Sequence, residues 1–139
     1  MNIELGNHDF GQGDASFRAA GGVEGITDLV TRFYVVMNTA PEAAVIRAMH
    51  PADLTVTEDK LARFLCGWLG GPRRFDEKYG PISIPRAHQH LVVREEERDA
   101  WLFCMERALR EVDYSDDFKS YLMRQLAVPA ERIRMTARD

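Results

Sequence analysis

The chain has 139 residues, a formal net charge of −4 and a sequence pI near 5.6. This length predicts one domain, and the acidic balance without an obviously basic face argues against a nucleic-acid partner. No stretch reaches the ~20 apolar residues of a membrane span, and the first residues lack the basic head and apolar run of a secretion signal. We therefore expect a cytoplasmic protein with no membrane partner.

The N-terminal residues are predicted to lie outside the helical core. Residues 1–18 are rich in Gly, Asn and Asp, a composition typical of a loop or a loosely docked tail. The A-G-G sequence at 20–22 is a flexible break before the first clear helix. We therefore expect an N-terminal extension over residues 1–18 and one folded domain over residues 19–139.

The first clear helix is predicted over residues 23–37. Its apolar residues recur at steps of three and four, which places them on one face. Phe33 and Tyr34 are adjacent and therefore point about 100° apart on a helix. One of these two rings can pack in the core while the other borders a cavity.

Two capping signatures predict the next two helices. The T-x-x-E pattern at 39–42 predicts a short helix that ends at His50, because the proline that follows disfavours helix in the residue before it. The same pattern at 55–58 predicts a longer helix to about Leu69, where a Gly-Gly-Pro sequence follows.

The second half of the chain is predicted to hold a loop and two more helices. Residues 73–85 show no sustained period, and we expect a loop with one short turn near Phe75. Residues 95–113 carry the strongest helical stripe, opened by three glutamates that favour a helix N-terminus. A last helix begins at 115–116 and is expected to break or kink at Pro129, with one or two further helical turns over residues 130–135. Because no alternating strand pattern occurs, the predicted fold class is all-α.

Several enzyme classes lack their motifs in this sequence. There is no G-x-S-x-G, P-loop, G-x-G-x-x-G or H-E-x-x-H motif, and no histidine follows a glutamate by three, as di-iron bundles require. Cys66 and Cys104 lie in apolar helical segments and are expected to be buried thiols. The absence of C-x-x-C-H excludes a covalently attached c-type haem. His88 and His90 alone indicate zinc only weakly.

The same histidines fit a haem site better. Haem needs one imidazole for its axial bond, an apolar pocket, and a few hydrogen-bond donors on the other face. His88 precedes a helix that opens with Trp101, and the indole of Trp101 and the phenol of Tyr34 keep their protons at neutral pH. The apolar residues of suitable size are Phe33, Leu54, Leu61, Phe64, Trp68, Phe75, Leu91, Trp101 and Met105. The alternative is a cofactor-free all-α interaction module in which these rings are plain core.

The order and spacing of several strings resemble the group II truncated haemoglobins. The strings are F-Y-x-x-M at 33–37, H-P-x-D-L at 50–54, W-L-G-G-P at 68–72 and E-R-D-A-W-L-x-C-M at 97–105. The resemblance covers about residues 20–128. It implies a truncated globin-like fold, a two-over-two helical sandwich around haem b.

The resemblance implies roles on both faces of the haem. His88 would be the proximal iron ligand, because the family's histidine precedes the helix tryptophan by thirteen residues and Trp101 minus thirteen is His88. Trp101 and Tyr34 would donate hydrogen bonds to the ligand on the distal side, joined by His50 at the corner between helices. Whether Tyr34 or His50 coordinates the iron when no gas is bound stays open.

The resemblance also implies contacts around the haem edge. Thr57 would stand where many globins keep a distal histidine, and Lys60 would reach a haem propionate. Leu91 would replace a phenylalanine of the family. The remaining pocket residues would be Leu54, Leu61, Phe64, Trp68, Phe75 and Met105.

One stretch departs from the family pattern. Where the family places an arginine directly before its histidine, this chain has Ala87 before His88, and Arg86 is shifted by one position. The proximal propionate contacts therefore stay open, and His90 competes with His88 as the iron ligand.

These residues lead us to expect a protein that binds O2, CO, NO or similar small ligands. Two or three donors around a partly negative ligand slow its release, since each is worth roughly 1–3 kcal/mol. We therefore expect sensing or redox chemistry with O2, NO or peroxide, including peroxidase-like or NO-dioxygenase-like activity with an unidentified reductase, rather than bulk oxygen transport. A homodimer would be unsurprising.

Overall fold

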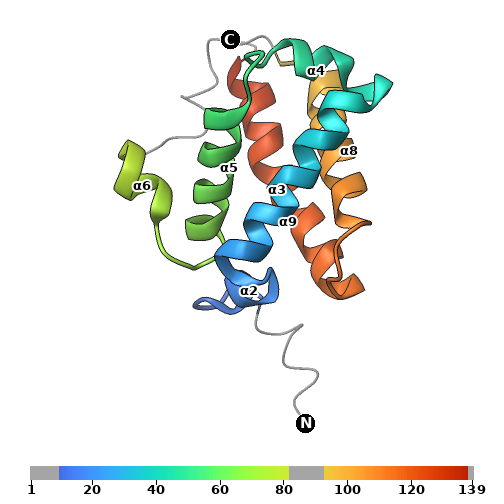
Figure 1. The fold of residues 1–139 in the computed structure, drawn as a ribbon. Coiled ribbons are helices and arrows are strands. Elements are labelled where there is room, and N and C mark those ends of the chain that lie inside the picture. The colour runs from blue at the N-terminus through green and yellow to red at the C-terminus, as the bar shows by residue number, and fades with distance from the viewer. Residues whose placement is uncertain (1–9, 82–92, 138–139) are drawn as a thin grey trace.

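The computed structural model describes residues 10–81 and 93–137, and every secondary-structure element in these two ranges is a helix (Figure 1). This confirms the all-α prediction. His88, His90 and Leu91 lie outside the described residues. The elements are α2 (Ala15–Ala19), α3 (Gly22–Thr39), the 3-10 turn η1 (Pro41–Ala43), α4 (Ala44–Ala48), α5 (Thr55–Trp68), α6 (Arg74–Tyr79), α8 (Glu95–Leu109) and α9 (Asp116–Ala137).

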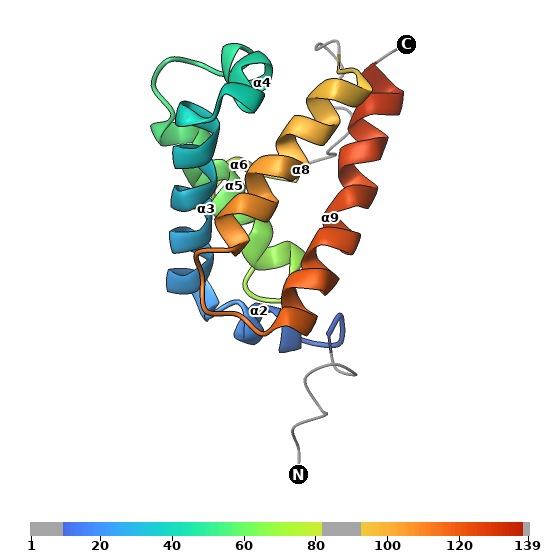
Figure 2. The ribbon, with the colours of Figure 1, turned by 90° about the vertical axis from the view of Figure 1, so that its right-hand side faces the viewer.

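The core lies where α3 packs against both α5 and α8, and α8 packs against α9 (Figures 1 and 2). The short helix α6 lies on the outer side of α5 in Figure 1. Burying each large apolar side chain stabilises the fold by about 1.5–3 kcal/mol, so these helix pairs supply most of the stability. The largest fully buried side chains are Phe33, Phe118, Ile26, Leu29, Met37, Met105, Leu109 and Leu122.

Both predicted capping boxes in the first half of the chain are wrong. Thr39 is the last residue of α3 rather than a cap, and its hydroxyl donates to the Val35 carbonyl at 2.8 Å, as a threonine inside a helix commonly does. At the start of α5, the Asp53 carboxylate accepts from the backbone N–H of Thr55 at 2.9 Å and from its hydroxyl at 2.7 Å. The T-x-x-E pattern found both regions but assigned the cap to the wrong residue.

The predicted break at Pro129 is also wrong, because α9 continues through it from Asp116 to Ala137. Proline removes one backbone hydrogen bond from a helix interior. Leu126 and Ala130 on either side of it are buried against the rest of the protein. Their burial holds the helix together across the missing bond, so the turns expected after Pro129 continue α9 without a break.

The segment before α3 is packed more closely than the sequence indicated. Of the expected loose tail, the described part docks on the core: the Phe10 ring lies 5.0 Å from that of Phe118, and the backbone N–H of Phe17 donates to the Leu69 carbonyl at 3.0 Å. A Cβ added to Gly71 would lie 2.4 Å from the Phe17 ring. A glycine at this position is what allows the segment to cross the end of α5. The division at residue 18 stays a prediction.

Candidate functional site

A cavity of about 670 Å³ is lined by residues of α3, α4, α5, α6, α8 and α9. Its size lies within the range of about 300–1,000 Å³ that small-molecule and cofactor sites occupy, and its lining is mostly apolar. Eight of the predicted site residues line it: Tyr34, His50, Thr57, Lys60, Leu61, Phe64, Phe75 and Trp101. The structure thus brings most of the described candidates together around one space.

Three predicted site residues do not belong to the described lining of this cavity. Met105 follows Trp101 by one helical turn and is fully buried in the core. Trp68 stacks on the Phe64 ring at 6.3 Å, and Leu54 is buried just before α5. The sequence pattern marks these residues as apolar and inward, but only the crossing of the helices decides which of them border the space.

The cavity also has lining residues that the sequence analysis missed. Four of them belong to α9, and their spacing places them on one helical face: Leu126, Pro129, Ala130 and Ile133. That periodicity was available in the sequence, but the break or kink expected at Pro129 divided it between two segments. The other missed residues are Ile46, Met49, Leu65, Tyr79, Pro81, Val93, Glu97 and Arg98.

Tyr34 and Trp101 present hydrogen-bond donors at the cavity wall. Tyr34 is 5% exposed. The Phe33 ring contacts both rings, with its centroid 4.8 Å from that of Tyr34 and 5.0 Å from that of Trp101. Burial raises the pKa of the Tyr34 phenol well above its ordinary value, with smaller contributions from the charges of Glu58 and Cys104, so the hydroxyl keeps its proton. Within residues 10–81 and 93–137, neither the phenol nor the indole N–H has a hydrogen-bond acceptor.

His50 lies beside Tyr34, with ring centroids 6.0 Å apart. Its Nδ1 is 2.7 Å from the Ile46 carbonyl oxygen, and only a protonated Nδ1 can donate to a carbonyl. The neutral ring therefore carries its proton on Nδ1, which leaves Nε2 as an acceptor. His50 can therefore donate to a ligand only as the imidazolium, and the neutral ring cannot serve as the third donor that the sequence predicted.

The cations around the cavity differ in their partners. Arg98 donates to Glu131 at 2.6 Å and pairs with Asp99 at 2.9 Å. Lys60 is exposed, and its ammonium lies 5.3 Å from the centroid of the Tyr79 ring. No carboxylate in the described part of the chain pairs with Lys60. Lys60 thus remains available to an anionic group.

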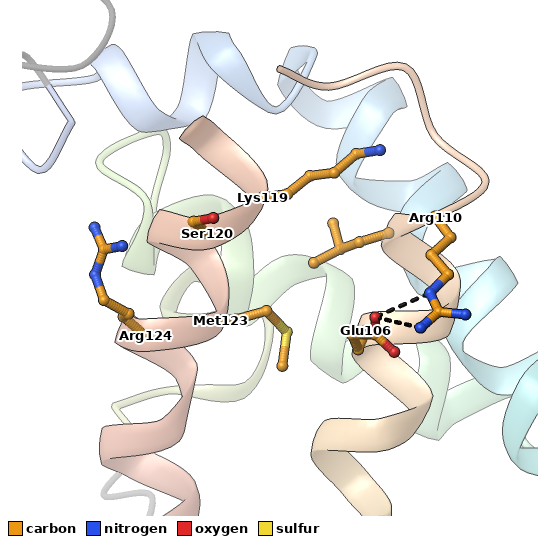
Figure 3. A pocket seen from close by; sticks show the side chains of 7 residues that line it. Glu106, Arg110, Lys119, Ser120, Met123 and Arg124 are labelled. Atoms are coloured by element: carbon orange, nitrogen blue, oxygen red, sulfur yellow. Dashed lines mark hydrogen bonds and ion pairs between the residues drawn. The ribbon is translucent and has the colours of Figure 1, made fainter. Parts of the chain in front are cut away.

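A second hollow of about 440 Å³ lies between the later part of α8 and the start of α9 (Figure 3). Leu109 and Met123 are among its lining residues, together with Lys119 and the ion-paired Glu106 and Arg110. It shares no described lining residue with the large cavity and contains none of the predicted site residues. The large cavity is therefore the functional candidate.

Other kinds of site find little support in the described residues. Cys66 and Cys104 are free and buried, as predicted, and burial raises the pKa of the Cys104 thiol to about 11. Across residues 10–81 and 93–137, no group of three or more His, Cys, Asp or Glu side chains could hold a metal ion. None of the described helices has the length and apolar character needed to span a membrane.

Comparison with known proteins shows which family this chain belongs to. The model of the bacterial-like globins matches residues 15–135. A group 2 truncated haemoglobin of Bacillus subtilis is 30% identical over 112 residues, which cover 81% of this chain and 83% of that protein.

Solved structures agree with that match. The group II 2-on-2 haemoglobin of Agrobacterium tumefaciens is 36% identical, with a TM-score of 0.81 and coverage of 86% of this chain and 92% of that one. A cold-adapted truncated haemoglobin of Pseudoalteromonas haloplanktis is 30% identical, with a TM-score of 0.81 and coverage of 85% and 95%. The chain therefore belongs to the bacterial-like globins, among the group II truncated haemoglobins.

Proposed function

We propose that this globin holds haem b in the large cavity, with His88 as the iron ligand, and uses it to bind O2 and similar diatomic ligands. Membership of the globin family implies haem and small gaseous ligands. The observation that carries the more specific proposal is the pair of donors, Tyr34 and Trp101, that line an apolar cavity without an acceptor in the described protein.

The described residues fit the haem group in three respects. The cavity has a volume of about 670 Å³ and a mostly apolar lining, as a porphyrin requires. Lys60, which pairs with no carboxylate in the described ranges, can face a propionate. Pro81 and Val93, the described residues that flank the segment with His88 in the sequence, both line the cavity. The same argument keeps His90 as the competing ligand.

The bound haem would supply an iron that binds diatomic ligands and exchanges electrons with them. The protein would act on the ligand through its own side chains. The Tyr34 hydroxyl and the Trp101 indole donate to a ligand that carries partial negative charge, each contributing roughly 1–3 kcal/mol in a water-poor cavity. A factor of ten in dissociation rate corresponds to about 1.4 kcal/mol, so two such bonds slow ligand release by orders of magnitude.

Slow release favours sensing, or redox chemistry with O2, NO or peroxide, over bulk delivery of oxygen. One relative, a truncated haemoglobin of Bacillus subtilis that is 30% identical to this chain, is described as oxygen-avid. Redox turnover would also require electrons from a separate reductase. The donor pair is what connects slow release to this chain.

Absorption spectra of the ferric, ferrous and CO-bound protein test the proposal. We expect a Soret band that shifts when CO is added, loss of stable haem in His88→Ala, and retention in the matched variant His90→Ala. Loss of haem in His90→Ala alone would assign the ligand to that residue. A folded, colourless wild-type protein that gains no Soret band when haem is added would support the cofactor-free interaction module instead.

A further inference from the structure

The carboxylate of Asp59 on α5 connects that helix to α6. It accepts a hydrogen bond from the Tyr79 hydroxyl at 2.6 Å and one from the Lys78 ammonium at 2.9 Å. The Arg63 guanidinium of its own helix donates to it at 2.9 Å. The Tyr79 bond lowers the pKa of Asp59 most, followed by those of Lys78 and Arg63, so the carboxylate stays ionised. These contacts hold the end of α6 against α5.

Tyr79 consequently turns its hydroxyl to Asp59 while its side chain lines the cavity. The Tyr79 ring also packs against Phe75, and the two ring centroids lie 5.0 Å apart. A phenol that donates to a carboxylate is polarised, which makes its ring more electron-rich and a better partner for a cation. The ring is therefore fixed in place before any ligand enters.

Two ammonium groups lie over this ring, and they differ in one respect. Lys60 and Lys78 are both 5.3 Å from the Tyr79 centroid. Lys78 is ion-paired with Asp59 at 2.9 Å, whereas Lys60 pairs with no carboxylate in the described ranges. Asp59 thus neutralises Lys78 and leaves the charge of Lys60 free at the cavity.

We propose that Tyr79, held by Asp59, is a positioning residue that seats the Lys60 ammonium at the mouth of the cavity, where it pairs with a carboxylate of the bound cofactor. A lysine side chain has many rotamers, and restricting them before binding reduces the entropy lost when the ion pair forms. The ring supplies that restriction without neutralising the charge. This inference rests on the proposed function, because it needs haem in the cavity.

The test compares haem with its dimethyl ester, in which both propionates are uncharged. The rate of cofactor loss to excess apomyoglobin is measured for the wild-type protein and for Lys60→Met, Tyr79→Leu and Tyr79→Phe at low ionic strength. With haem, we expect Lys60→Met and Tyr79→Leu to release it roughly two- to fivefold faster, the range an exposed ion pair supports. Tyr79→Phe, which keeps the ring but loses the bond to Asp59, should lie between these variants and the wild type.

With the dimethyl ester, all three variants should release the cofactor at the wild-type rate. Lys78→Met is the matched comparison, since it removes a cation at the same distance from the same ring that is already paired with Asp59, and its haem-loss rate should rise less than that of Lys60→Met. Urea unfolding of each apoprotein shows whether a variant is folded.

Equal acceleration with haem and with the ester would mean that Tyr79 only supports the wall, and would overturn the inference. An unchanged haem-loss rate in Lys60→Met, or an equal effect of Lys78→Met, would also overturn it. A wild-type protein that binds neither haem nor its dimethyl ester would overturn the proposed function itself. This outcome is recognised from the wild-type protein alone, without the variants.

Discussion

The inner wall of the cavity, where Tyr34 and Trp101 lie, and its rim, where Asp59, Lys60 and Tyr79 lie, treat polar groups in opposite ways. The wall carries the buried Tyr34 and the half-buried Trp101, whose donors have no acceptor among the described residues and face the cavity, so a ligand can satisfy them. At the rim, the Asp59 carboxylate already has cationic partners, Lys60 pairs with no described carboxylate, and both side chains are partly exposed to water. Because water weakens charge interactions, single changes at the wall should have larger effects than changes at the rim.

The largest effect is expected from Trp101→Phe. This change keeps an aromatic ring but removes the indole N–H, so the O2 dissociation rate should rise about ten- to a hundredfold. Stopped-flow displacement of O2 by CO measures the rate. Trp68→Phe is the control, because Trp68 lies outside the described cavity lining and its replacement should leave the rate unchanged. An unchanged rate in Trp101→Phe would remove this residue from ligand stabilisation.

Tyr34→Phe should raise the O2 dissociation rate about tenfold, while the urea stability of the apoprotein stays the same or increases. The reason is that the lost hydroxyl bonds to a ligand and to no described protein acceptor. Because the pKa of the phenol is raised, it stays protonated in alkaline solution, and the difference between wild type and variant should persist up to pH 10. A marked loss of apoprotein stability would show that the hydroxyl has a structural partner.

At the rim, Asp59→Asn should lower the free energy of unfolding by only about 1 kcal/mol, since the carboxylate is partly exposed. The pKa of Asp59 is lowered in the folded protein, so its contribution is present above the ordinary carboxyl pKa of about 4 and is lost as the pH falls further. Urea titrations should show the same difference in stability between wild type and Asp59→Asn at pH 7 and pH 5, and a smaller difference at pH 3. A loss as large as that of a buried ion pair would break the contrast between wall and rim.

The smallest effect is expected at His50, which lies beside the wall and is half-buried. Because its Nδ1 proton is donated to the Ile46 carbonyl, the neutral ring has no second N–H to offer a ligand. His50→Phe should therefore change the O2 dissociation rate at pH 8 by less than about twofold, measured by the same stopped-flow displacement. A tenfold rise in that rate would show that His50 donates to the ligand.

The helices of this protein can be predicted from short stretches of its sequence, and so can many of the residues that line the cavity. The apolar spacing of residues 23–37 and 95–113 places the side chains of α3 and α8 correctly, because helical periodicity depends only on neighbours along the chain. Tyr34 and Trp101 became candidates because both keep a donor proton at neutral pH and because the sequence resembles the group II truncated haemoglobins. The break or kink that the sequence predicts at Pro129 follows from the local preference of proline, and burial of Leu126 and Ala130 outweighs it.

The spacing of apolar residues in the sequence determined the all-α fold class, which the described residues confirm, and its strings of residues resemble one globin family. Only the tertiary structure decided which inward residues border the cavity, separating Phe64 from Trp68 and Trp101 from Met105. The tertiary structure also brings Asp59 into contact with Tyr79, twenty positions away along the chain, and leaves Lys60 without a described carboxylate partner. The physical reason is that periodicity tells which face of a helix is apolar, whereas cavities and charge partners depend on how separate helices cross and where their ends meet.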